Sequence, residues 1–300
     1  MSLRPTVRPA TPQLRRRILA WYQTNARNLP WRKTKNPYRI LISEVMLQQT
    51  QVTRVLEKYH RFIRRFTSFE VLARASAAEV IRAWSGMGYN NRSVRLRELA
   101  RIVRDRFNGR LPSRVDELLL LPGIGRYTAH AVACFAFGQR VPLADTNIAR
   151  VLARLFPGEG PDPWSIADRI LPRRHVYEWN QALMELGATI CTAARPKCTS
   201  CPVVRMCPSA FSIAARKATL HKKERGRNGI PNRIYRGRII ELLRKSNSRG
   251  RGLMDIGRGV KPNFSAADHK WLVTLLAGLE RDGLIQSRNR GNSVVLRLAS

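Results

Sequence analysis

The chain has 300 residues, 44% of them hydrophobic, which is enough to bury a sizeable core and to form two domains. It carries 55 Lys and Arg against 20 Asp and Glu, and this net charge of +35 predicts a polyanionic partner, first of all nucleic acid. No run approaches the ~18 apolar residues that span a bilayer, which excludes a membrane-spanning protein. We expect a soluble protein in the cytoplasm of a bacterial or archaeal cell, associated with the nucleoid. An Arg-rich codon usage is the alternative source of the charge.

The first part of the chain reads as a basic arm followed by a long helical region. Residues 1–12 contain Pro5 and Pro9 among basic residues and predict a flexible arm. Residues 13–212 show short amphipathic segments separated by Gly, Pro, Asn and Asp, without strand-like alternation, so this part is expected to be almost wholly α-helical. Examples of expected helical segments are residues 71–84, 92–107 and 115–121.

Residues 121–129, Leu-Pro-Gly-Ile-Gly-Arg-Tyr-Thr-Ala, lie between two of these helical segments. Gly123 and Gly125 permit a tight turn and leave backbone N–H groups uncovered at the start of the second helix. Free amides and the positive end of the helix dipole form an anion site that contacts a phosphate and not a base. The pattern therefore predicts a helix-hairpin-helix that grips a nucleic-acid backbone.

Asp145 lies about twenty residues further on and precedes an expected helix at residues 148–156, with Asn147 two positions later. An Asp in such a place is most often an N-cap, since its carboxylate accepts hydrogen bonds from the first free amides. By this pattern alone Asp145 is a helix cap, and a catalytic role stays open.

Four cysteines follow within seventeen residues, at Cys191, Cys198, Cys201 and Cys207. Gaps of six, two and five residues suit a short loop that gives one thiolate to each iron of a [4Fe-4S] cluster. Structural zinc is the alternative, but it favours two close Cys pairs and only Cys198 and Cys201 form one. Disulfides are disfavoured by the odd total of five cysteines and the absence of an apolar signal segment. Cys134, in an apolar helix, is expected to be a core residue.

The last part of the chain predicts a linker and a small second domain. In residues 213–232 Lys, Arg and Gly crowd together and apolar residues become sparse, which indicates an exposed basic linker. Residues 233–300 predict two helices and a basic hairpin, the pattern of a winged helix. Such a domain binds duplexes in many proteins, and a plain protein-contact module is the alternative. The expected helices are residues 235–245 and 266–282, and the strands 283–288 and 293–298 flank a turn at 289–292.

The order of these motifs resembles the helix-hairpin-helix (HhH-GPD) DNA glycosylase superfamily over residues 18–207. The resemblance implies a two-lobed, mainly α-helical fold at residues 13–212, with a cluster loop at 191–207. It also implies that Asp145 faces the sugar of a flipped nucleotide and stabilises positive charge on C1′, while Asn147 helps to hold that carboxylate. The implied [4Fe-4S] cluster braces a loop that contacts DNA and takes no part in the chemistry.

Residues 37–52 are similar to the MutY-type adenine DNA glycosylases within that superfamily, as are residues 29–32 and 86–89. The resemblance implies that Glu44 is the general acid that protonates adenine at N7. Five of the eight neighbours of Glu44 in residues 41–49 are large and apolar, which favours a buried carboxyl over a surface or capping Glu. The implied DNA-contacting residues are Arg32, Gln48, Gln49, Thr50, Met87, Tyr89, Gly123, Gly125 and Arg126.

Tyr127 stands where bifunctional relatives such as endonuclease III have the lysine that attacks the sugar. A tyrosine offers no amine for a Schiff base, so the resemblance implies a monofunctional glycosylase in which Tyr127 orients the substrate or Asp145. A Tyr packed in the core beside the hairpin is the alternative.

The predicted function is therefore base-excision repair of double-stranded DNA by a monomeric enzyme that removes adenine opposite 8-oxoguanine or guanine. The chain departs from the family in lacking an evident nudix-like C-terminal domain, in Asn90-Asn91, and in Thr146 where Gly is commoner. A mismatch-specific thymine or uracil glycosylase is the second reading, although such enzymes tend to have basic residues at the positions of Gln48 and Gln49. A catalytically silent DNA-binding protein is a third, but it is expected to lack Glu44 or Asp145.

Overall fold

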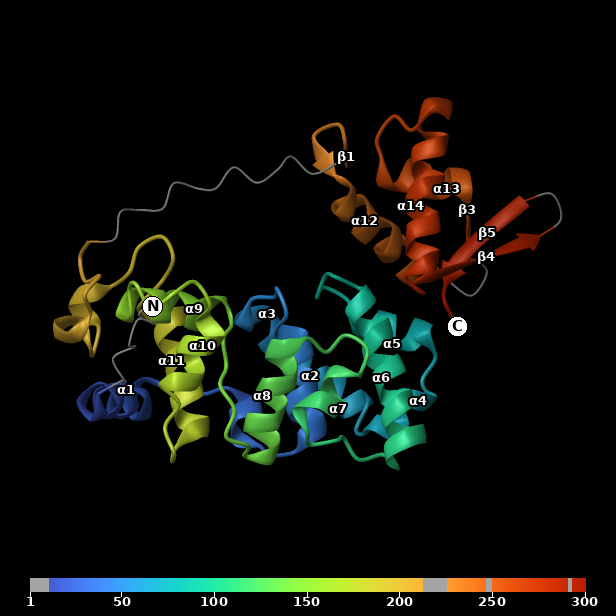
Figure 1. Ribbon diagram of the computed structural model, residues 1–300. Coiled ribbons are helices and arrows are strands. Elements are labelled where there is room, and N and C mark those ends of the chain that lie inside the picture. Colours follow the sequence, from blue (N-terminus) through green and yellow to red (C-terminus); the bar gives the residue numbers. More distant parts are fainter. Residues whose placement is uncertain (1–10, 213–225, 247–249, 291–292) are drawn as a thin grey trace, which may run out of the picture. The chain divides into compact units, whose positions relative to one another are not determined.

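The computed structural model describes residues 11–212, 226–246, 250–290 and 293–300 (Figure 1). Predictions for residues 1–10 of the arm, 213–225 of the linker and 291–292 of the hairpin tip lie outside the described residues. The described part is mainly helical, which confirms the predicted fold class. Within it, no helix is both long and apolar enough to cross a membrane.

Two compact units divide the chain, and each is assembled from segments that are distant in sequence. The first contains Met1–Leu41, Ser113–Leu119 and Ile124–Leu220, and the second contains Ile42–Pro112, Leu120–Gly123 and His221–Ser300. The domain boundaries predicted at residues 12, 212 and 232 stay predictions.

Helices of the first unit enclose one hydrophobic core. α11 (Val176–Thr189) packs against α9 (Thr146–Leu155) and α1 (Pro12–Asn25), and Trp179 and Ile148 are fully buried between them. This packing places the start of α9, where Asp145 lies, against α11. The other elements of this unit are η1 (Pro30–Lys33), α7 (Val115–Leu119), α8 (Arg126–Phe137), α10 (Pro163–Arg169), η2 (Cys198–Ser200) and η3 (Val204–Met206).

α2 (Pro37–Leu47) leads into the second unit, and the single helix expected at residues 71–84 is wrong there. The first helix ends at Arg74 because Ser76 starts a new helix with a capping box. Ser76 Oγ accepts from the Glu79 amide at 3.2 Å, and Glu79 Oε2 accepts from the Ser76 amide at 2.9 Å. The helices are α3 (Val52–Arg65), α4 (Phe69–Arg74), α5 (Ala77–Ala83) and α6 (Asn91–Phe107).

The C-terminal part of the second unit has the predicted two helices and hairpin, together with a third helix that the sequence pattern did not indicate. An antiparallel sheet of order β3-β5-β4 joins them, with Gln286 paired with Arg297. This is a winged-helix arrangement. The elements are β1 (Gly226–Arg227), β2 (Ile230–Pro231), α12 (Asn232–Arg244), β3 (Arg251–Gly252), α13 (Leu253–Val260), η4 (Ala266–Asp268), α14 (His269–Arg281), β4 (Ile285–Arg290) and β5 (Ser293–Leu298).

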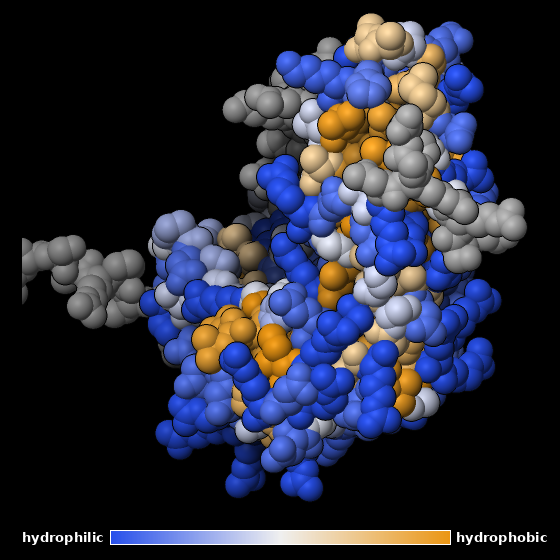
Figure 2. All heavy atoms as spheres, turned by 90° about the vertical axis from the view of Figure 1, so that its right-hand side faces the viewer, coloured by the Kyte–Doolittle hydropathy of each residue, from blue (hydrophilic) through white to orange (hydrophobic). Residues whose placement is uncertain are grey.

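The C-terminal helices share a hydrophobic core with α5. Ala77 and Ile81 of α5 are buried in the same cluster as Tyr235, Ile239 and Leu276. Outside this core the surface is polar, and Figure 2 shows hydrophilic residues over most of one face, with smaller hydrophobic patches between them.

Candidate active site

Asp145 is the N-cap of α9, as the capping interpretation predicted. Its Oδ1 accepts a hydrogen bond from the Ile148 amide at 2.7 Å, and its Oδ2 accepts one from Asn147 Nδ2 at 3.0 Å. Burial raises the pKa of Asp145 above its ordinary value, whereas these hydrogen bonds oppose that rise. The cap leaves a half-buried carboxylate with both oxygens fixed in position.

Asn147 is itself held by Arg150, one turn further along α9. Arg150 Nη2 donates to Asn147 Oδ1 at 2.8 Å and to the Gly187 carbonyl at 2.6 Å, while Arg150 Nε donates to the Cys191 carbonyl at 2.8 Å. A chain of hydrogen bonds thus runs from Asp145 through Asn147 and Arg150 to the start of the cysteine loop.

Gly187 of α11 lies directly against the beginning of α9. A Cβ atom on this residue would stand 2.8 Å from Asn147 Cβ and 2.9 Å from the Asn147 carbonyl oxygen. Only a residue without a side chain allows this approach, so the position of Asn147 depends on Gly187.

Tyr127 lies in the first turn of α8 and packs against the core of the first unit. Its hydroxyl donates a hydrogen bond to Met184 Sδ at 3.5 Å. A tyrosine has no amine at this position, and its role in orienting substrate or Asp145 stays a prediction.

Glu44 belongs to α2 and is 5% exposed. Ile42, Val45 and Met46 beside it in the helix are also buried, so the carboxyl lies in the poorly solvated setting that the sequence favoured. Its role as general acid stays a prediction.

The predicted helix-hairpin-helix consists of α7, a turn at residues 120–125 and α8. Gly123 has φ of +80°, a conformation that favours glycine, and Gly125 is the N-cap of α8 with no capping side chain. Arg126, the first residue of α8, stacks its guanidinium 4.1 Å from the centre of the Trp164 ring. The amides at the start of α8 are thus not covered by a capping side chain.

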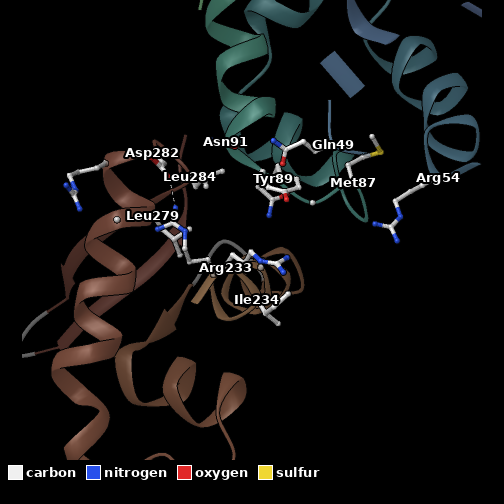
Figure 3. Close-up of a pocket in the computed structure, with 16 residues that line it drawn as sticks. Gln49, Arg54, Met87, Tyr89, Asn91, Arg233, Ile234, Leu279, Asp282 and Leu284 are labelled. Atoms are coloured by element: carbon white, nitrogen blue, oxygen red, sulfur yellow. Dashed lines mark hydrogen bonds and ion pairs between the residues drawn. The ribbon is translucent and has the colours of Figure 1, made fainter. Parts of the chain in front are cut away.

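Gln49 and Tyr89 lie in two turns of the second unit, one after α2 and one before α6. Both are exposed and have positive φ, +52° and +43°. Met87 is only 1% exposed, whereas Tyr89 is 49% exposed, so of these two expected DNA contacts only Tyr89 is open to solvent (Figure 3). Gln48 Nε2 donates to the Gly123 carbonyl at 3.4 Å.

The side chain of Arg92 forms hydrogen bonds to both of these turns. Its Nη1 donates to two carbonyls in the last turn of α2 and to the Gln48 carbonyl in the turn that follows, the last at 2.7 Å. Its Nη2 donates to Thr50 Oγ1 at 2.9 Å and to the Gly88 carbonyl at 3.1 Å. Burial lowers the pKa of Arg92 to about 10. One buried guanidinium therefore fixes both turns and the strained backbone within them.

Arg32 occupies an internal position. Its Nη2 pairs with Glu185 Oε2 at 2.6 Å, its Nε donates to Gln181 at 2.9 Å, and its side chain is 9% exposed. Arg27 also pairs with Glu185, whose side chain is fully buried. These contacts hold η1 against α11, and the DNA contact of Arg32 stays a prediction only.

The four cysteines Cys191, Cys198, Cys201 and Cys207 line one small cavity and form no disulfide. Among the described residues, no three His, Cys, Asp or Glu side chains are close enough together to hold a single metal ion. A [4Fe-4S] cluster takes one thiolate at each of its four irons, so its ligands stand further apart than those of one ion. The donor set fits such a cluster.

A family description, "HhH-GPD superfamily base excision DNA repair protein", matches residues 42–171. An adenine DNA glycosylase of Mycobacterium tuberculosis is 43% identical over 237 residues, which are 76% of this chain and 77% of the relative. The chain belongs to the adenine DNA glycosylases.

A second adenine DNA glycosylase and two solved structures of other DNA glycosylases are also similar to this chain. An adenine DNA glycosylase of Mycolicibacterium smegmatis is 39% identical, over 77% of this chain and 80% of the relative. A thermostable thymine-DNA glycosylase superposes with a TM-score of 0.63 and 33% identity, over 66% of this chain and 95% of that chain. Endonuclease III trapped on DNA superposes with a TM-score of 0.59 and is 25% identical, over 67% of this chain and 96% of that chain.

Two residues of the site in this adenine DNA glycosylase, Arg92 and Arg150, were not predicted from the sequence. A weak signal existed for Arg92, because it lies in the first turn of α6, where the helix dipole disfavours a cation. The sequence carried no such signal for Arg150, since an arginine in the middle of a helix is common on protein surfaces.

Proposed function

We propose that this chain removes adenine from duplex DNA in base-excision repair by hydrolysing the N-glycosidic bond, and that the substrate adenine stands opposite 8-oxoguanine or guanine. The observation that carries this proposal is the fixed carboxylate of Asp145 in a member of the adenine DNA glycosylases. Its two oxygens are held by the start of α9 and by Asn147.

Asp145 has the role of stabilising charge. When the bond between base and sugar lengthens, positive charge develops on C1′ of the flipped nucleotide, and a nearby carboxylate lowers the energy of that state. Because the hydrogen bonds to Ile148 and Asn147 already fix the carboxylate, little reorganisation is needed as the charge appears.

Glu44 has the role of general acid. Its buried carboxyl gives a proton to N7 of adenine, so that the base leaves neutral, and water then adds to C1′ and loses a proton. The products are free adenine and an abasic site. Tyr127 cannot form a Schiff base, so the strand is left intact and the enzyme is monofunctional.

DNA is held in the proposal by backbone amides and two exposed turns. The uncapped start of α8, after Gly123 and Gly125, takes a phosphate of the backbone. Gln49 and Tyr89 reach the strands from turns that Arg92 keeps in place.

We also propose that Cys191, Cys198, Cys201 and Cys207 bind a [4Fe-4S] cluster. The cluster braces the loop that carries Arg195, Lys197 and Arg205 and so presents cations to DNA phosphates. Analysis of the purified protein should find about four irons per chain with matching sulfide; one zinc and no iron would contradict the proposal.

A second candidate function is the release of thymine or uracil opposite guanine, since a thymine-DNA glycosylase is among the similar structures. Both functions are tested with four duplexes, carrying A opposite 8-oxoguanine, A opposite G, T opposite G and U opposite G, treated with alkali after incubation. Cleavage of the adenine strands alone is expected. Cleavage of the T or U strands alone would establish the second function, and cleavage before alkali would contradict a monofunctional enzyme.

A further inference from the structure

Trp164 belongs to α10, but its indole ring lies beside the start of α8. The guanidinium of Arg126, the first residue of α8, stands 4.1 Å from the centre of that ring. This is the distance of a cation stacked on an aromatic face, and tryptophan holds a cation in this way better than tyrosine or phenylalanine does. The contact therefore ties the side chain of Arg126 to a second helix of the first unit.

The Trp164 ring is also in contact with His130, which lies one turn after Arg126 on α8. The two rings meet edge to face, with their centres 4.9 Å apart. His130 Nδ1 donates to the Pro142 carbonyl at 2.9 Å, so the imidazole is anchored to the segment that leads to Asp145. Trp164 thus packs along the first turn of α8, with Arg126 and His130 both against its ring.

Arg126 contributes the positive charge of this group. Burial lowers the pKa of His130, and the nearby charge of Arg126 lowers it further, against the hydrogen bond to Pro142, so the imidazole is neutral at neutral pH. Arg126 is exposed, and it forms no ion pair with any acidic residue that the structure describes. Its guanidinium is a charge without a counter-ion in this part of the chain, and the Trp164 ring sets its orientation.

Stacking leaves the hydrogen-bond donors of Arg126 available. A guanidinium is planar, so an aromatic ring covers its face while its N–H groups point outward in the plane. These donors form the fork that binds two oxygens of one phosphate. The uncapped amides at the start of α8 belong to the same end of the helix, since Gly125 has no side chain to cover them. Backbone and side-chain donors for a phosphate therefore occur together there.

A fixed side chain binds better than a mobile one. Ordering one long side chain at an interface weakens binding by about two- to twelvefold, because the side chain loses rotamer freedom. An arginine that is already held on an aromatic face has lost part of this freedom before DNA arrives. The stack on Trp164 should therefore raise the affinity that Arg126 contributes.

We infer that Trp164 is a positioning residue for DNA binding, which holds the Arg126 guanidinium so that its donors face a backbone phosphate at the start of α8. The inference rests on the proposed function in taking DNA as the ligand of this helix end. It gives Trp164 a role in affinity and none in the chemistry of base release.

The test is a double-mutant cycle of Trp164→Leu, Arg126→Gln and the two together. Equilibrium binding of an A:8-oxoguanine duplex is measured over a salt series in the Asp145→Asn background, so that base release plays no part in the readout. Trp164→Leu should weaken binding by about two- to twelvefold and keep the salt slope, because the charge of Arg126 remains. Arg126→Gln should make the slope of log affinity against log salt shallower by about 1, since one phosphate is no longer neutralised.

The double variant separates positioning from a plain structural role. Once Arg126→Gln has removed the guanidinium, Trp164→Leu should have no further effect on affinity. Equal weakening by Trp164→Leu with and without Arg126 would overturn the inference. Trp164→Phe keeps a weaker aromatic face and should recover part of the affinity that Trp164→Leu loses. An affinity no better than that of Trp164→Leu would likewise overturn it.

Trp21→Leu is the matched control, because Trp21 is another half-buried tryptophan of the first unit and no arginine in the described part of the chain is stacked on its ring. This variant should keep the affinity and the salt slope. A loss equal to that of Trp164→Leu would mean that general packing is at work, and would overturn the inference. Failure of the proposed function would instead appear in the base-release assay.

Discussion

The guanidinium of Arg150 donates to Asn147 Oδ1 at 2.8 Å, and this bond fixes the orientation of the Asn147 amide. Because the oxygen faces Arg150, the NH₂ group must face Asp145, where it donates at 3.0 Å. The Asn147 amide could otherwise face either way, so Arg150 ensures that it donates a hydrogen bond to the proposed catalytic carboxylate.

Asn147→Asp should shift the acid limb of the pH–rate profile to higher pH. A second carboxylate beside Asp145 disfavours its anion and raises its pKa further. Activity needs the anion, so it is present above that pKa and lost as the pH falls through it. Single-turnover rates between pH 4 and pH 8, about the range in which carboxyl groups and histidine titrate, measure the shift. If the acid limb of the variant lies at the same pH as that of the wild type, the proposed contact between residue 147 and the catalytic Asp145 is contradicted.

Asp145→Asn should lower the single-turnover rate by at least about 10²-fold while DNA binding persists, since the charge is removed and the shape kept. Asp162→Asn is the matched control, because Asp162 caps α10 in the same way, with hydrogen bonds from Trp164 and Ser165. If both variants lose activity equally, the loss comes from helix capping and not from catalysis.

Glu44→Gln should slow adenine release by about 10²–10⁴-fold, the usual contribution of a general acid. Glu98→Gln, at an exposed position of α6, serves as control and should leave the rate as it is. An unchanged single-turnover rate in Glu44→Gln would remove this residue from the mechanism.

Gly187→Ala should lower the free energy of unfolding by about 1–3 kcal/mol, the usual cost of overpacking, because the new Cβ meets Asn147. It should also lower the rate of base release by displacing Asn147. In the control Gly237→Ala, the new Cβ on α12 meets nothing within 4 Å, so this variant should instead gain up to about 1 kcal/mol of stability. Thermal and denaturant unfolding measure the stability of both variants. If Gly187→Ala stabilises the protein as much as Gly237→Ala does, then α9 can move away from the new Cβ without loss of stability.

Arg92→Met should lower the free energy of unfolding by at least about 2 kcal/mol, since each buried acceptor left unsatisfied costs roughly 1–3 kcal/mol. The carbonyls of Gln48 and Gly88 are among those that lose their donor. Arg106→Met, exposed on the same helix, is the control and should change stability little. DNA affinity should fall with Arg92→Met alone; a wild-type affinity would mean that the two turns hold their shape without it.

The sequence predicted the helical class, the helix-hairpin-helix and the C-terminal hairpin, because each depends on local patterns of apolar residues and glycines. It did not predict α13, where Gly257 argues against a helix. The glycine is required there by packing, since a Cβ would stand 2.5 Å from the Phe264 ring. The pattern also joined α4 and α5, because the capping box at Ser76 interrupts a run that is otherwise helical.

The candidate site was predicted only in part. Asp145 was identified from its neighbours in sequence, and its capping bonds are local. Arg92 and Arg32 take their roles from partners such as Thr50, 42 residues away, and Gln181, 149 residues away, and no pattern along the chain records such pairs. Only the fold shows which arginines bond to internal partners, as Arg32 and Arg92 do, and which remain exposed.

The core that α5 shares with α12 and α14 has a consequence for how this enzyme can be altered. Removing the last part of the chain would bare Ala77 and Ile81 to water and take away the bond from Arg244 to Asn90. Shortened forms should therefore be poorly soluble, and grafting a different C-terminal module would require a matching apolar face on α5.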